Sequence, residues 1–227
     1  EIGVLQPLKE LAVICRKRGI AFHSDAAQAF GNITLEPDNL GLDLVSLSAH
    51  KLYGPKGIGA LVIRDGIRLL PLQWGGGQEA GLRAGTLPSA LIVGFAAAVQ
   101  QAMLDRNERN VRLAALRDQL WNGLQKRIPH IVLNGNIETR LSHNLNITFP
   151  GISGNNLHRT LRPDLACSSG SACSKGIPSH VLQAIGRSRS EAEASLRLSL
   201  GRSTTLEEVN KAVELISRAA TQCKKHL

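Results

Sequence analysis

The sequence predicts an α/β fold, on three observations. Short and nearly continuous apolar runs, such as residues 42–48 and 59–63, are typical of strands that are buried on both faces of a sheet. Amphipathic stretches of helical period precede and follow these runs. Glycine-rich segments, Gly54–Gly57 and Gly75–Gly77, lie between the elements, where the backbone must turn tightly or approach another group closely.

The first part of the chain predicts one helix and a set of strands. The helix is expected over residues 4–18, because Pro7 lies near its start and Gly19 is a typical stop. The apolar runs after it predict strands over 20–24, 42–48 and 59–63.

The second part begins with a long helical pattern from Pro88 to about Arg127, which predicts two helices or one kinked helix. Within its charged half, residues 106–126, we expect a buried stripe of Val111, Leu113, Leu116, Leu120 and Leu124. The later elements expected are a strand over 142–149, a short helix before Arg162, another after Pro178, a strand over 196–200 and a terminal helix over 206–222.

These elements predict two domains in the 227 residues. Residues 1–88 are expected to form the C-terminal half of a larger α/β domain, and 89–127 a long connecting helix region. Residues 128–227 are expected to form a smaller α+β domain. Because the chain opens on Glu1 and not on Met, we expect a processed N-terminus or a piece of a longer protein.

Composition and charge exclude several classes of protein. The contents of 43% hydrophobic and 20% charged residues are ordinary for a globular chain and exclude disorder. No apolar run reaches the ~18–20 residues that a membrane span needs. The net charge of +9 permits anionic partners, but the basic residues recur in short groups at expected helix ends, where they complement the helix dipole. Because only 3% of the residues are aromatic and available to stack on bases, the sequence does not predict nucleic-acid binding.

The four cysteines predict neither a disulfide framework nor a metal site. They are Cys15, Cys167, Cys173 and Cys223. A chain of this length needs no disulfides for stability, no Cys-x-x-Cys pair occurs, and His180 lacks zinc-ligand spacing to Cys173. Cys15 is expected on the buried side of the first helix, whereas Cys167 and Cys173 flank a loop rich in glycine and serine.

Lys51 is the first candidate functional residue. It follows directly after the strand 42–48 and the polar step Ser48-Ala49-His50. Lysine is almost never fully buried without a partner, and a desolvated lysine amine condenses with carbonyl groups to form a Schiff base. A loop lysine that faces solvent explains the position about equally well.

Asp25 is the second candidate. It ends the strand 20–24, at the edge where α/β proteins bind ligands. A carboxylate there can pair with a protonated ring nitrogen, and together with Lys51 it indicates pyridoxal 5'-phosphate (PLP). The alternative is that Asp25 caps a following helix, which is worth ~1 kcal/mol.

Five motifs then extend the pattern. They are His23–Gln28 (HSDAAQ), Ser48–Gly57 (SAHKLYGPKG), Arg83–Pro88 (RAGTLP), Ser168–Cys173 (SSGSAC) and Ser195–Arg202 (SLRLSLGR). Together and in this order they resemble the cysteine desulfurases, fold-type I PLP enzymes of the class V aminotransferase family that remove sulfur from L-cysteine. The resemblance continues to the end of the chain, and it implies a PLP-binding large domain and a smaller C-terminal domain.

The resemblance implies roles for the candidate residues. Lys51 would bind PLP covalently, Asp25 would pair with the pyridine nitrogen, Gln28 would hydrogen-bond the phenolic oxygen, Ser48 and His50 would bind the phosphate, and Thr86 would bind the phosphate of a neighbouring subunit in a homodimer. Arg197 would bind the substrate carboxylate through two parallel hydrogen bonds. Cys173 would be the nucleophile, with His50 and Arg197 as sources of positive charge that favour its thiolate.

The implied products are L-alanine and an enzyme persulfide. The sulfur would pass to an acceptor protein, such as an iron–sulfur scaffold, or serve tRNA thiolation, in a cytoplasmic setting. Two alternatives stay open at this point. One is another class V enzyme, a selenocysteine lyase or an aminotransferase. The other is an inactive fragment, or a dimerisation module that exposes the helix 106–126.

The sequence departs from the family at its start. Glu1 comes directly after the position where the family has an asparagine that contacts the cofactor. The resemblance therefore implies that the N-terminal part of the large domain is missing. We expect the 227 residues alone to be inactive.

Overall fold

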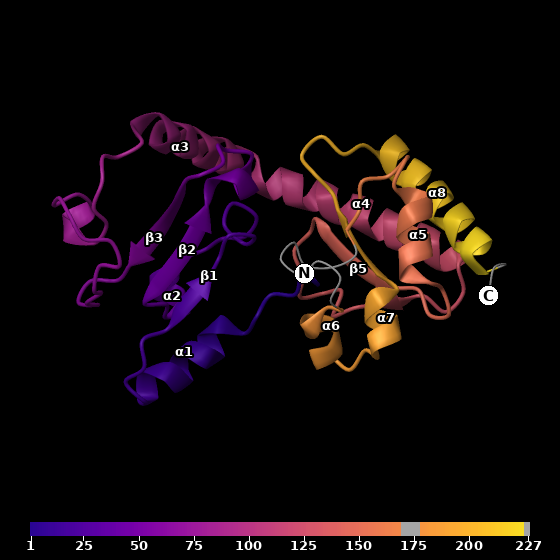
Figure 1. Cartoon of the computed structure of the whole chain (residues 1–227), viewed down its shortest axis with the longest axis horizontal. Coiled ribbons are helices and arrows are strands. Elements are labelled where there is room, and N and C mark those ends of the chain that lie inside the picture. Colours follow the sequence, from indigo (N-terminus) through magenta and orange to yellow (C-terminus); the bar gives the residue numbers. More distant parts are fainter. Residues whose placement is uncertain (169–177, 225–227) are drawn as a thin grey trace. The chain divides into compact units, whose positions relative to one another are not determined.

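The computed structural model describes residues 1–168 and 178–224, which form two compact units (Figure 1). The N-terminal unit comprises Gln6–Arg106. The C-terminal unit comprises Glu1–Leu5 together with Asn107–Leu227. The apolar helix Ser89–Leu104 therefore belongs to the same compact unit as the strands that precede it in the chain.

The N-terminal unit is a mixed sheet with helices around it. Its elements are α1 (Leu8–Lys17), β1 (His23–Asp25), α2 (Pro37–Leu40), β2 (Leu44–Ser48), η1 (Ala49–Leu52), β3 (Gly59–Ile63), η2 (Glu79–Gly81) and α3 (Ser89–Leu104). The strand order is β1-β2-β3, with β1 and β2 parallel and β2 and β3 antiparallel. The parallel strands β1 and β2 are therefore neighbours, and their carboxyl ends lie at the same edge of the sheet.

Two small clusters hold this unit together. One contains Ala26, Leu42 and Val45 around the ends of β1 and β2, and the other contains Ala49, Leu52, Phe95 and Ala102 between η1 and α3. The expectation that each strand is buried on both faces is wrong for β3. Leu61 and Val62 point to opposite faces, and they are 45% and 42% exposed, so both sides of this strand are open to solvent.

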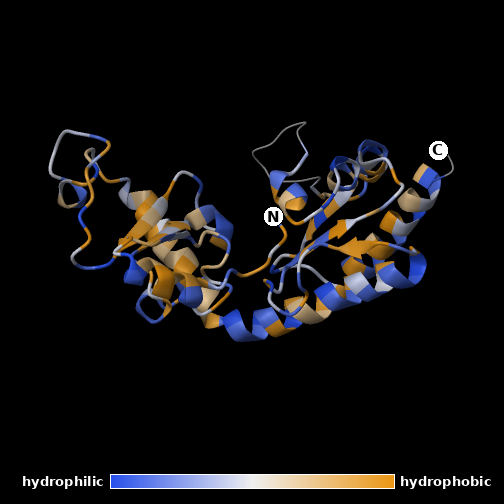
Figure 2. Ribbon diagram, turned by 90° about the horizontal axis from the view of Figure 1, so that it is seen from below, coloured by the Kyte–Doolittle hydropathy of each residue, from blue (hydrophilic) through white to orange (hydrophobic). Residues whose placement is uncertain are grey.

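The C-terminal unit is an antiparallel sheet covered by helices. Its elements are α4 (Arg106–Arg127, of which Arg106 is counted with the other unit), β4 (Val132–Leu133), β5 (Asn144–Thr148), α5 (Gly154–Leu161), α6 (His180–Ala184), α7 (Arg189–Glu193), β6 (Ser195–Ser199) and α8 (Leu206–Lys224). The strand order is β4-β5-β6. Figure 2 shows hydrophobic strands inside each unit and hydrophilic residues on the helices around them.

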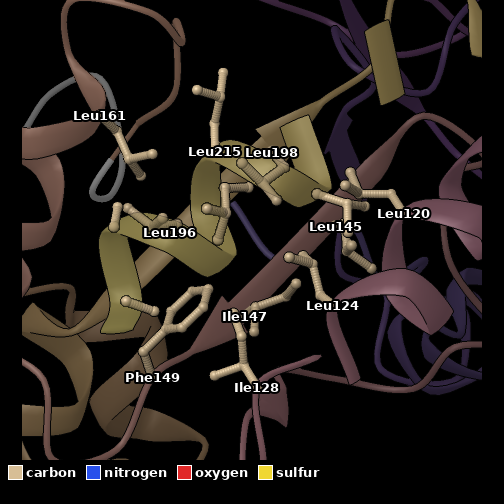
Figure 3. Packing of buried hydrophobic residues seen from close by; sticks show 14 of the residues in the cluster. Leu120, Leu124, Ile128, Leu145, Ile147, Phe149, Leu161, Leu196, Leu198 and Leu215 are labelled. Atoms are coloured by element: carbon tan, nitrogen blue, oxygen red, sulfur yellow. The ribbon is translucent and has the colours of Figure 1, made fainter. Parts of the chain in front are cut away.

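The main core lies on one face of this sheet. Leu145 and Ile147 of β5, and Leu196 and Leu198 of β6, pack against α4, α5 and α8 (Figure 3). Leu124 of α4 is completely buried in it. Burying an apolar side chain of this size contributes about 1.5–3 kcal/mol, so this cluster is the main source of stability in the unit.

The long helical pattern is two helices, α3 and α4, which meet at Asp105. One residue of the predicted stripe is misplaced: Val111 is 74% exposed, whereas Leu113, Leu116, Leu120 and Leu124 are buried. Val111 lies two positions before Leu113, about 200° away around the helix, and so falls on the opposite face. Among the described residues, no helix has both the length and the hydropathy that crossing a membrane requires.

Candidate functional site

The parallel strands β1 and β2 bring most of the candidate residues to one edge of the N-terminal sheet. Asp25 is the last residue of β1, and in the ladder it is paired with Ser46 of β2. Ser48 ends β2, and η1 with His50 and Lys51 follows at once. Since the carboxyl ends of parallel strands meet at the same edge, a carboxylate, a hydroxyl, an imidazole and an ammonium group share this edge.

Asp25 is exposed and followed by a turn. Its Oδ1 accepts a hydrogen bond from the Ala27 backbone N–H at 2.8 Å, and the backbone N–H groups of Ala29 and Phe30 bond to the Ala26 carbonyl. The alternative that Asp25 caps a helix is therefore wrong, because no helix begins there. No described residue donates a hydrogen bond to Oδ2, which leaves that oxygen available to a ligand.

Lys51 is held through its neighbours in η1. Ala49 and Leu52 are buried against Phe95, whereas Lys51 itself is exposed and forms no ion pair with a described residue. The Gly54 backbone N–H bonds to the Ala49 carbonyl at 3.0 Å, and a Cβ at Gly54 would lie 2.9 Å from that oxygen. This close turn fixes η1. Lys51 is exposed among the residues that the structure describes, and its role as a Schiff-base lysine stays a prediction.

Ser48 and His50 are already paired. The Ser48 Oγ and the His50 Nδ1 lie 2.9 Å apart. Two residues before Ser48 in β2, the Ser46 Oγ lies 2.7 Å from His23 Nε2 of β1, a contact between the two strands that the sequence did not predict. Hydroxyl and imidazole groups at a strand end can donate hydrogen bonds to phosphate oxygens.

Gln28 and Thr86 lie on exposed segments of the same unit. Gln28 is in the turn after β1, where its carbonyl accepts a hydrogen bond from the Asn32 side chain at 2.9 Å. Thr86 lies between η2 and α3, directly after Gly85, whose φ of 113° requires glycine and whose N–H bonds to Gln78 Oε1 at 3.1 Å. Their roles toward a cofactor stay predictions.

Arg197 belongs to the C-terminal unit. It lies at the centre of β6, opposite Asn146 of β5, and is half-buried. Leu196 and Leu198 are buried on the core side, and the alternation of side chains along the strand therefore sends Arg197 to the other face. No described residue forms a side-chain hydrogen bond or an ion pair with its guanidinium group, so its donors are free for a ligand among the residues that the structure covers.

The cysteines differ in their surroundings. Cys167 is half-buried and packs against the main core, and this burial raises the pKa of its thiol. Cys15 is also half-buried, and Cys223 is buried in α8. Cys173 lies outside the described residues, so its role stays a prediction. Among the residues that are described, no group of acidic, histidine and cysteine side chains could hold a metal ion.

The side chains at the edge of the N-terminal sheet fit PLP. Asp25 offers a free carboxylate oxygen for a protonated ring nitrogen, Lys51 offers a free amine, and Ser48 with His50 offers donors for a phosphate. These are four chemically different groups at one edge of the sheet, the place where α/β proteins bind cofactors.

Residues 1–212 match the family model described as "Aminotransferase class-V". The chain belongs to the class V aminotransferase family. Among curated members of the family, it is 48% identical over 220 residues to "Cysteine desulfurase IscS" of Tolumonas auensis, covering 95% of this chain and 54% of that protein. It is 45% identical over 221 residues to the protein of the same name from Ehrlichia chaffeensis, with coverage of 95% and 54%.

Solved structures of related proteins agree in fold. A NifS-like protein from Rickettsia africae superposes with a TM-score of 0.90 at 31% identity, covering 97% of this chain and 59% of that one. The chain spans about half the length of the curated relatives it matches.

Proposed function

We propose that this chain carries part of a PLP-dependent cysteine desulfurase, which converts L-cysteine into L-alanine and a persulfide on Cys173. The observation that carries the proposal is the meeting of Asp25 and Lys51 at one edge of the β1–β2 sheet. Identities of 45–48% to proteins named cysteine desulfurase support it.

Each residue has a task in this reaction. Lys51 attaches the cofactor and moves the proton at the substrate Cα. Asp25 holds a proton at the ring nitrogen, and Ser48 and His50 bind the phosphate. Gln28 donates a hydrogen bond to the phenolic oxygen. When bound, PLP supplies an electron sink for negative charge at the substrate Cα.

Arg197 and Cys173 act on the substrate itself. The Arg197 guanidinium binds the carboxylate through two parallel hydrogen bonds, a geometry that lysine cannot reproduce. The Cys173 thiolate attacks the substrate sulfur, a sulfur–sulfur bond forms, and the substrate carbon–sulfur bond breaks. The electron pair of the broken bond stays with the carbon skeleton, which gains protons and leaves as alanine.

The partners in this proposal are a second copy of the chain and a sulfur acceptor. Thr86 would bind the phosphate in the neighbouring subunit of a homodimer. The persulfide would be transferred to an acceptor such as an iron–sulfur scaffold protein or a tRNA-thiolating enzyme.

The test uses two proteins, the 227-residue chain alone and a chimera in which this chain replaces the matching part of the Tolumonas auensis relative. We expect the chimera to bind added PLP with a visible absorbance band and to release alanine and sulfide from L-cysteine. Alanine release that persists in Cys173→Ala would instead favour another class V activity, such as a selenocysteine lyase or an aminotransferase. If the chimera showed no absorbance band, the result would favour the alternative of a non-catalytic dimerisation module.

A further inference from the structure

The face of the C-terminal sheet opposite the main core is polar and yet buried. Four of its residues, which we call the polar layer, are Asn134, Asn146, Thr148 and Ser195. Their exposed fractions are only 0–1%. The burial of this polar face was not predicted from the sequence.

A network of hydrogen bonds connects the residues of the polar layer to one another. Asn134 Nδ2 donates to Asn146 Oδ1 at 2.7 Å and to Thr148 Oγ1 at 2.8 Å. The hydroxyls of Thr148 and Ser195 lie 2.7 Å apart. The layer therefore joins all three strands, because Asn134 follows β4 while the others belong to β5 and β6.

The layer also holds the segment that contains α6 and α7. Arg187, between these two helices, donates from Nε to Asn134 Oδ1 at 2.7 Å. Ser195 Oγ donates to the Glu191 carbonyl of α7 at 2.8 Å. Since the Arg187 cation can bond only to an oxygen, it fixes the orientation of the Asn134 amide and, through it, the orientation of the Asn146 amide.

Arg197 lies on the same face of the C-terminal sheet as the polar layer. It lies two residues from Ser195 on β6, and its partner in the β5–β6 ladder is Asn146. Side chains of directly paired residues point to the same face and lie about 4.5–5.5 Å apart at Cβ. Asn146 is therefore the neighbour of Arg197 across the ladder, and the pair of Thr148 and Ser195 is the next ladder pair on the same face.

Such a layer contributes little to stability for the area it occupies. Buried polar groups return only about 1 kcal/mol net per hydrogen bond, whereas apolar residues of the same size gain more from burial. A fully satisfied polar network instead specifies a single arrangement of the side chains in it. On this sheet the core face supplies the stability, and the opposite face supplies a rigid surface beside Arg197.

We propose that the polar layer is a positioning device for Arg197, which holds its guanidinium in the orientation that binds the substrate carboxylate. Asn134 is the centre of this device, and Arg187 connects it to α6 and α7. The identity of the substrate in this inference rests on the proposed function. The geometry of Arg197 does not depend on it.

The test removes one hydroxyl without changing side-chain volume. Thr148→Val deletes a buried hydrogen-bonding group, Thr148→Ser keeps it, and Ser217→Ala deletes a hydroxyl on α8 that is buried without a partner. In the chain alone, ¹⁵N NMR follows the Arg197 Nε–H signal, assigned by its loss in Arg197→Lys. We expect Thr148→Val to shift or split this signal, and Thr148→Ser and Ser217→Ala to leave it unchanged.

In the chimera, we expect Thr148→Val to raise KM for L-cysteine about fivefold, the value of one hydrogen bond, with kcat within about twofold. Thr148→Ser should restore KM. An unchanged Arg197 signal in Thr148→Val, or a KM equal to that of Ser217→Ala, would overturn the proposal. If the wild-type chimera did not turn over cysteine, the proposed function would fail, and the NMR signal would still decide whether the layer positions Arg197.

Discussion

The backbones of Ser168 and Arg197 pair with each other. Arg197 N–H donates to the Ser168 carbonyl at 2.7 Å, and Ser168 N–H donates to the Arg197 carbonyl at 3.2 Å. Ser168 is five residues before Cys173 in the chain. The last described residue before the proposed nucleophile therefore pairs with the residue that we propose binds the substrate carboxylate.

Arg197→Lys tests the carboxylate role. One ammonium group cannot make two parallel hydrogen bonds, so we expect KM for L-cysteine in the chimera to rise at least about tenfold, with little change in melting temperature. Steady-state kinetics and thermal unfolding measure the two effects. A normal KM together with a large loss of thermal stability would show that Arg197 is a structural residue.

Lys51→Ala should abolish covalent attachment of PLP. Lys51 is in the short helix that directly follows β2, whereas Lys56 lies beyond the Gly54 turn. After borohydride reduction, mass spectrometry of the chimera should find the cofactor on the peptide with Lys51 and should not find it in Lys51→Ala. Lys56→Ala is the matched control and should retain the adduct. A reducible adduct in Lys51→Ala would refute the assignment.

Asp25→Asn separates charge from backbone structure. An asparagine Oδ1 can still accept the hydrogen bond from Ala27 N–H that Asp25 accepts at 2.8 Å, so the turn should persist. The amide cannot hold a proton on the ring nitrogen, so we expect bound PLP but a kcat at least about a hundredfold lower. Circular dichroism, visible absorbance and kcat measure these outcomes. A near-normal kcat would reduce Asp25 to a turn residue.

Leu124→Ala tests the main core. Leu124 is completely buried, so its truncation should lower the free energy of unfolding of the C-terminal unit by about 2–5 kcal/mol. Val111→Ala on the same helix changes a residue that is 74% exposed and should cost less than about 0.5 kcal/mol. Urea unfolding followed by tryptophan fluorescence compares them. Equal losses would mean that α4 packs through another face.

Much of the fold could be predicted from local patterns. Strand β3, the two helices after Pro88 and the terminal helix follow directly from apolar period and from turn residues. The two-residue strand β4 and the short helices α2 and α7 are too brief for any period, and Val111 shows that a stripe can include a residue from the wrong face.

The site was predicted less evenly. The sequence shows that Asp25, Ser48 and Lys51 lie at a strand end or just after one. The parallel pairing that brings them to the same edge could be inferred only from the resemblance or seen in the structure. The polar layer was missed because its members are far apart in sequence: Asn134 and Ser195 are separated by 61 residues. Only an unusual run of polar residues on one side of the strand 142–149 hinted at a buried partner.

The most direct measurement locates the sulfur atom. Cys167 packs against the core and burial raises the pKa of its thiol, so at neutral pH it stays protonated and a poor nucleophile. We incubate the chimera with L-cysteine, digest it without reductant and identify the persulfide by mass spectrometry. We expect one added sulfur atom on Cys173, its loss together with alanine release in Cys173→Ser, and near-normal activity in Cys167→Ser. Sulfur found on Cys167, or full activity in Cys173→Ser, would contradict this expectation.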